Sequence, residues 1–105
     1  MGSIAGIWDV VVKSPVGDLV VVYTFTDAAG LVAGTASSEA ETVPLANVVC
    51  RDTSEGRQVT WRQSVTRPAK LNLEFDVTFA GDALSGYSKV SRLLPKIGVS
   101  GSRRV

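Results

Sequence analysis

Few side chains in this sequence are of types that carry out acid–base, nucleophilic or metal chemistry. The 105 residues include no histidine and a single cysteine, Cys50. A chain without histidine cannot form a Ser-His-Asp or Cys-His relay, or an ordinary zinc site with histidine ligands. The sequence also lacks a Walker loop, a dinucleotide-binding fingerprint and a calcium-loop pattern. We therefore expect no metal and no cofactor.

The single cysteine cannot form a disulfide within the chain. Stability must therefore come from packing or from association with another chain. We interpret Cys50 as a small buried hydrophobe. The alternative is a thiolate favoured by the positive charge of the adjacent Arg51.

The best candidates for a site are polar side chains at positions where the alternation of apolar and polar residues predicts an inward orientation. Four such residues are Tyr23, Asn47, Gln63 and Ser88. An unpaired polar group in an apolar interior costs about 1 to 3 kcal/mol. Each is therefore bonded to a neighbour, wetted at an open end, or placed to contact a ligand. Together with aromatic residues on the same faces, they give the predicted ligand-binding set Tyr23, Phe25, Asn47, Trp61, Gln63, Phe75 and Ser88.

Acid–base chemistry inside the fold would require an inward titratable side chain. The alternation places Asp9, Lys13, Glu74 and Asp76 on the opposite, outward faces. Tyr23 is then the only inward titratable group and the only candidate catalytic residue. An enzyme of this kind would work through binding shape, desolvation and one hydroxyl.

Alternation with a period of two runs through most of the chain and predicts the strands that must position these side chains. The clearest case is residues 71–79, where five apolar side chains alternate with four polar ones. In residues 43–51 the same reasoning assigns Asn47 and Val49 to the inner face and places Pro44 at the strand start or at a bulge. The predicted strands are residues 8–13, 19–26, 31–37, 43–51, 58–66, 71–79, 83–90 and 97–104.

These strands predict an all-β fold, a single antiparallel up-and-down β-barrel of about eight strands, with a β-sandwich as the alternative. A meander leaves two exposed edges unless the sheet curls and closes. An eight-stranded barrel encloses a lumen that side chains just fill or that holds one small ligand. We expect residues 1–105 to form one domain, and we leave Met1 to Ser3 out of the fold argument because they are consistent with an expression remnant.

The charge of the chain is nearly balanced, with a formal net charge of +1. Residues 1–56 carry two bases and seven acids, whereas residues 57–105 carry nine bases and three acids. In a closed fold the two halves lie side by side and neutralise each other; the alternative is a basic mouth that attracts an acidic ligand. A net charge of +1 offers no strong field, so we expect no nucleic-acid and no membrane partner. The apolar run 19–23 is too short to span a bilayer, and the start of the chain lacks a signal-peptide pattern, which predicts a cytoplasmic protein.

The two ends of the chain carry a short signature. Gly6-Ile7-Trp8 opens the first predicted strand, and Arg103 and Arg104 close the last. This arrangement resembles the calycin superfamily, the lipocalins and fatty-acid-binding proteins. The resemblance implies that Trp8 plugs the closed end of the barrel beneath an arginine of the final strand, which stacks on the ring and bonds nearby carbonyls.

Three functions are compatible with these features. The first is a lipocalin-like barrel that binds a small, mostly apolar ligand in its lumen. The second is a small barrel isomerase, cyclase or lyase that acts on a hydrophobic or polyketide-like substrate. The third is an assembly or accessory module, favoured by the outward apolar pair Val20 and Val22. A homodimer is compatible with all three.

Overall fold

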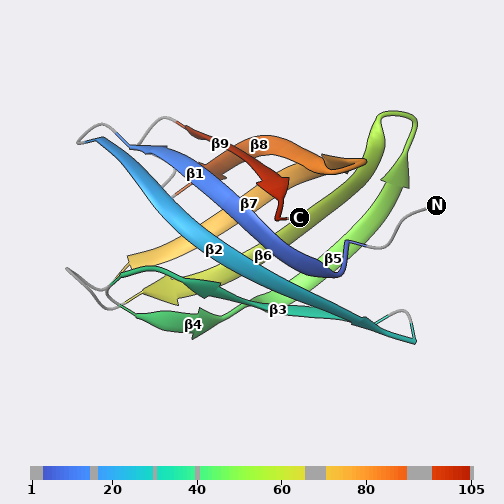
Figure 1. Ribbon diagram of the computed structural model, residues 1–105, viewed down its shortest axis with the longest axis horizontal. Coiled ribbons are helices and arrows are strands. Elements are labelled where there is room, and N and C mark those ends of the chain that lie inside the picture. The colour runs from blue at the N-terminus through green and yellow to red at the C-terminus, as the bar shows by residue number, and fades with distance from the viewer. Residues whose placement is uncertain are drawn as a thin grey trace.

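The described part of the protein consists of β-strands and short connections. The computed structural model describes residues 4–14, 17–29, 31–39, 41–65, 71–89 and 96–104. Within these ranges no helix is long and apolar enough to cross a membrane. The strands, labelled in Figure 1, are β1 (Gly6–Ser14), β2 (Gly17–Ala28), β3 (Leu31–Ser37), β4 (Thr42–Pro44), β5 (Ala46–Thr53), β6 (Gly56–Val65), β7 (Leu71–Ala80), β8 (Ala83–Lys89) and β9 (Ile97–Arg103).

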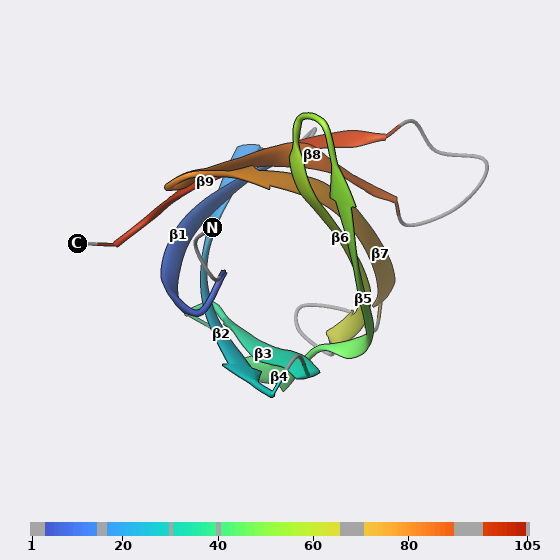
Figure 2. The same cartoon turned by 90° about the vertical axis from the view of Figure 1, so that its right-hand side faces the viewer.

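All nine strands belong to one antiparallel sheet. Their order is β4-β3-β2-β1-β9-β8-β7-β6-β5, so β1 lies between β2 and β9 and joins the first strand of the chain to the last. Figure 2 shows the sheet curled into a nearly closed ring, with its two ends, β4 and β5, next to each other. The predicted all-β barrel is confirmed, and the sandwich alternative is wrong.

The predicted strand 43–51 is divided between β4 and β5. Pro44 ends β4, which pairs with β3, and β5 pairs with β6. The register shifts between Ala46 and Val49, and Asn47 adopts a left-handed backbone with φ of 54°. Such a β-bulge places two residues of one strand opposite one residue of its partner and reverses the alternation beyond it.

The bulge overturns the predicted inner face of this strand. Asn47 is exposed, Val49 is 58% exposed, and Val48 between them is half-buried. The prediction that Cys50 is a buried hydrophobe is also wrong, because its side chain is exposed at the edge of the sheet.

Aromatic side chains occupy much of the barrel interior. The buried rings contact one another with centroid separations from 4.8 Å for Trp8 and Phe79 to 6.1 Å for Tyr23 and Phe75. Edge-to-face and stacked pairs at such separations stabilise a core beyond the area that they bury. The rings involved are those of Trp8, Tyr23, Phe25, Trp61, Phe75 and Phe79.

One end of the barrel is closed around Trp8. The Cζ atom of Arg103 lies 4.5 Å from the Trp8 ring centroid. Its Nη1 donates a hydrogen bond to the Ala5 carbonyl, and its Nε donates to Asp82 Oδ1 at 2.8 Å. The Trp8 indole donates to the Ile4 carbonyl at 2.9 Å. The N-terminal segment, the last strand and the β7–β8 turn are thereby joined at this end.

The space around two glycines predicts different effects on stability when each is replaced by alanine. A Cβ on Gly86 would lie 2.1 Å from the Asp76 carbonyl oxygen and 2.6 Å from Val77 Cα, both backbone atoms. A Cβ on Gly98 would meet nothing closer than Lys13 Cγ at 3.8 Å. We expect Gly86→Ala to lower the free energy of unfolding by about 3 kcal/mol through overpacking. Gly98→Ala, the matched control, should change it by less than about 1 kcal/mol.

Urea unfolding followed by circular dichroism measures both variants. Equal losses in Gly86→Ala and Gly98→Ala would contradict the close approach of β7 and β8.

Candidate functional site

The interior contains one polar node built around the Gln63 amide. The Tyr23 hydroxyl donates to Gln63 Oε1 at 2.8 Å, and the Trp61 indole nitrogen donates to the same oxygen at 3.0 Å. An indole N–H can only donate, so the atom that it faces must be the amide oxygen and the orientation of the amide is fixed. All three side chains are buried. The node therefore satisfies two buried donors with one acceptor and offsets the cost of burying them.

The Tyr23 hydroxyl stays protonated in this environment. Burial raises the pKa of Tyr23, and its hydrogen bonds with Gln63 and Trp61 offset only part of that effect. A neutral phenol that donates to an amide oxygen is neither a base nor a ready acid near neutral pH. The geometry thus gives Tyr23 the role of a fixed hydrogen-bond donor.

The barrel brings together six of the seven residues predicted for a ligand site. Tyr23 and Phe25 extend from β2, and Trp61 and Phe75 stack at 5.1 Å with an interplanar angle of 8°. Ser88 lies opposite Phe75 in the register and is buried. The seventh residue, Asn47, does not join them, because the bulge in β5 turns its side chain to the exterior.

Two polar side chains are buried toward the end of the barrel opposite Trp8. Gln63 and Ser88 lie near the last residues of β6 and β8, strands that both run away from the closed end. Half-buried Leu73 and Ile97 stand opposite them in the neighbouring strands, and half-buried Val21 is near the start of β2. The predicted strand residue Val90 lies outside the described residues. This end therefore combines apolar side chains with two buried polar groups.

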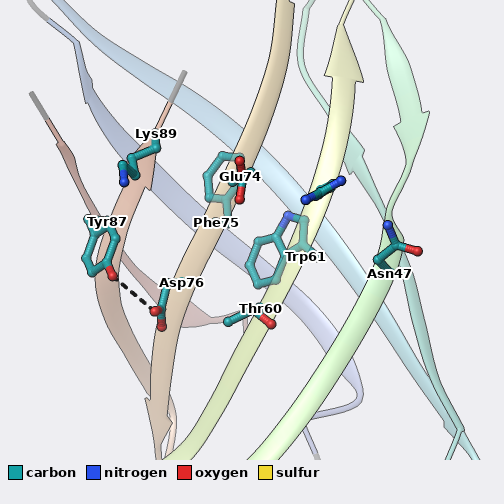
Figure 3. A pocket seen from close by; sticks show the side chains of 9 residues that line it. Asn47, Thr60, Trp61, Glu74, Phe75, Asp76, Tyr87 and Lys89 are labelled. Atoms are coloured by element: carbon teal, nitrogen blue, oxygen red, sulfur yellow. Dashed lines mark hydrogen bonds between the residues drawn. The ribbon is translucent and has the colours of Figure 1, made fainter. Parts of the chain in front are cut away.

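A pocket of about 340 Å³ lies on the outer face of the barrel wall, over β5 to β8. Figure 3 shows Tyr87 and Lys89 at one side of it and Asn47 at the other, with Asp76 and Glu74 between them. Sequence reasoning placed the carboxylates on the outer face but did not find the pocket, because it depends on which strands are neighbours. Its lining residues are Asn47, Thr60, Trp61, Arg62, Glu74, Phe75, Asp76, Tyr87 and Lys89.

The outward apolar residues singled out on β2 are only partly exposed. Val20 is 65% exposed and lies opposite half-buried Val11, whereas Val22 is half-buried. One exposed valine beside a half-buried one is common on protein surfaces. An assembly role and a homodimer therefore stay predictions.

The environment of Cys50 does not promote a thiolate. Partial desolvation, together with the carboxylates of Asp27 and Asp52, raises the pKa of the Cys50 thiol, and the charge of Arg57 opposes this only in part. Among the described residues, no three His, Cys, Asp or Glu side chains form a group that could hold a metal ion. The described part of the chain thus contains neither an activated thiol nor a cluster of metal ligands.

Comparison with known proteins adds no relative. No protein-family model matches the chain, and no curated protein matches it in sequence. The geometry of the barrel is therefore the basis for inferring a function.

Because Gln63 Oε1 accepts two hydrogen bonds, replacing Gln63 should destabilise the fold more than replacing one of its donors. Gln63→Leu leaves the Tyr23 hydroxyl and the Trp61 indole without their acceptor, and we expect it to lower the free energy of unfolding by about 3 kcal/mol. Tyr23→Phe removes one donor and leaves the other bond intact, which should cost about 1 kcal/mol. Ser64→Ala, an exposed control on the same strand, should cost less than about 0.5 kcal/mol. Chemical denaturation tests this order, and a Tyr23→Phe loss as large as that of Gln63→Leu would refute the shared acceptor.

Burial of the Tyr23 phenol also predicts that the free energy of unfolding depends on pH in alkaline solution. Unfolded Tyr23 has the ordinary pKa of 10.0, and the folded pKa is higher, so the unfolded chain loses this proton first. The contribution of Tyr23 to the free energy of unfolding should be constant below pH 10. Above pH 10 it should decrease by about 1.4 kcal/mol per pH unit, up to the pKa of the folded state. Tyr23→Phe should remove this slope, whereas the outer-face control Tyr87→Phe should keep it. An unchanged alkaline slope in Tyr23→Phe would show that the phenol titrates normally.

Proposed function

We propose that this protein is a lipocalin-like barrel that binds one small, mostly apolar molecule at the end of its lumen opposite Trp8. The observation that carries the proposal is the burial of Gln63 and Ser88 at that end, among half-buried apolar side chains. Binding sites for small molecules are typically apolar with a few polar groups that fix orientation. This end of the barrel has that composition.

The Gln63 amide supplies the polar group best placed for a ligand. Its oxygen already accepts from Tyr23 and Trp61, which leaves the two N–H donors of Nε2. Within the described part of the chain, no hydrogen bond joins Nε2 to another residue. A carbonyl or hydroxyl oxygen of a ligand would satisfy these donors, and Ser88 would add a hydroxyl.

The closed end gives a second line of support. The resemblance to calycins implies a tryptophan beneath an arginine of the last strand, and Arg103 stacks on Trp8 at 4.5 Å. Such an end closes the lumen on one side and leaves ligand entry to the other. The aromatic rings packed above Trp8 limit the depth that a ligand could reach, which favours a small one.

Binding is favoured over catalysis by the lack of acid–base groups inside. Tyr23 is the only titratable side chain among the buried residues that the structure describes, and its hydroxyl is held as a donor. An isomerase, cyclase or lyase would have to work with that hydroxyl alone. We therefore place the enzyme second and propose no catalytic residue beyond Tyr23.

A neutral fluorescent probe, N-phenyl-1-naphthylamine, tests the lumen site. We expect saturable binding of one equivalent, with a shift of the Trp61 indole resonance in NMR spectra and no shift of Trp8. Leu73→Trp should block the end and weaken binding at least about tenfold, equivalent to about 1.4 kcal/mol. Val20→Trp adds the same ring to an exposed outer position and should leave binding unchanged.

Two results would overturn the proposal. One is the absence of saturable binding together with no copurified small molecule in native mass spectra of the protein from its own cells. The other is probe binding that shifts only resonances of the outer face. Because the NMR shifts are measured on the unmodified protein, the test does not depend on the folding of Leu73→Trp.

A further inference from the structure

The outer pocket contains a row of three charges that alternate in sign. The register places Arg62 of β6 opposite Glu74 of β7, and Glu74 opposite Lys89 of β8. Neighbouring strands are about 4.8 Å apart, so the charges of this row are presented at roughly that interval.

These three side chains are not engaged with one another. None forms an ion pair with another described residue, although each stands next to a charge of opposite sign. Ion pairs elsewhere on the described surface are well formed, and their basic members are Lys13, Arg57, Arg103 and Arg104. The row therefore keeps its hydrogen-bonding capacity for another molecule.

The adjacent row of the pocket is held in place by its own hydrogen bonds. Asp76 accepts from Gln58 Nε2 at 2.9 Å through one oxygen and from the Tyr87 hydroxyl at 3.1 Å through the other. Lys96 Nζ lies 4.1 Å from the centroid of the Tyr87 ring. Figure 3 shows the bond between Tyr87 and Asp76 at the side of the pocket. This row is a preorganised wall, and the free charges are those of Arg62, Glu74 and Lys89.

The bulge in β5 completes the pocket with an amide. Asn47 has a left-handed φ of 54°, which is uncommon for a residue other than glycine, and its exposed side chain borders the pocket. Bulges re-aim side chains and are frequent beside functional sites. The Asn47 amide supplies both a donor and an acceptor.

We propose that this pocket binds an acidic α-amino acid, a molecule with two carboxylates and one ammonium group. The sequence of charges in the row is positive, negative, positive, and such a ligand offers the complement. Arg62 can hold one carboxylate in a bidentate pair, Glu74 the ammonium, and Lys89 the second carboxylate. A simple anion would meet the repulsion of Glu74, and a neutral or cationic molecule would leave the two bases unpaired. A pocket of about 340 Å³ accommodates a molecule of this size.

This site is separate from the lumen site. The residues that carry it, Arg62 and Glu74, are exposed, whereas the rings of the adjacent Trp61 and Phe75, which also border the outer pocket, are buried in the barrel core. The proposal goes beyond the proposed function and does not depend on it.

Titration of the full chain with L-glutamate at low ionic strength, followed by amide NMR shifts, tests the proposal. We expect saturable shifts confined to β5–β8, with a dissociation constant on the order of 1 mM for an open, charged site. Glutarate lacks the ammonium and L-glutamine lacks the second carboxylate, so each should bind at least about fivefold more weakly. Glu74→Gln should also weaken glutamate binding by about fivefold or more, and the matched control Glu55→Gln, in the exposed β5–β6 turn, should not.

Three results would overturn the assignment. Glutarate binding as tight as glutamate would show that the ammonium is not recognised. Shifts that do not saturate, or that spread over the whole surface, would show a general charge effect. Equal losses in Glu74→Gln and Glu55→Gln would place the binding elsewhere.

Discussion

Pairing of β1 with β9 is the constraint on which the rest of the barrel depends. It joins strands from the two ends of the chain and leaves only β4 and β5 at the ends of the sheet. The same register sets Trp8 opposite Arg103, which brings the guanidinium over the indole and within reach of the Ala5 carbonyl. A slip of one residue would turn Arg103 to the outer face and leave the closed end uncovered. The register between β1 and β9 therefore both closes the sheet into a barrel and covers Trp8 at one end of it.

The interior tolerates polar atoms because a single acceptor serves two donors. With Gln63 Oε1 bonded by Tyr23 and Trp61, the barrel interior pairs its most costly polar groups without introducing a charge. Among the described residues, the formal charges lie outside this buried interior, where water lowers their energetic cost. The inner face therefore offers an apolar surface with a few hydrogen-bonding groups, and the outer face offers charge.

Sequence alone predicts the strands and the inner faces where alternation is uninterrupted. Tyr23, Trp61, Gln63 and Phe75 were placed inside correctly because inward and outward positions alternate without interruption over residues 23–26 of β2 and along β6 and β7. The prediction of the inner face fails on β5, because the extra residue at Asn47 exchanges inward and outward positions in the rest of the strand. Asparagine tolerates a left-handed backbone better than most residues, but its type does not reveal whether it adopts one. Only pairing with β6 shows the bulge.

The outer pocket was beyond sequence reasoning for a different reason. Alternation predicts the face of each residue on its own strand, whereas the row Arg62, Glu74 and Lys89 exists only through the registers of β6, β7 and β8. A shift of two residues in one register would keep every face unchanged and still break the row. Two independent features of the sequence and fold therefore determine how residues 60–62 and 74–76 are arranged. Hydrophobic alternation places Trp61 and Phe75 inside, and strand register determines which charges stand side by side outside.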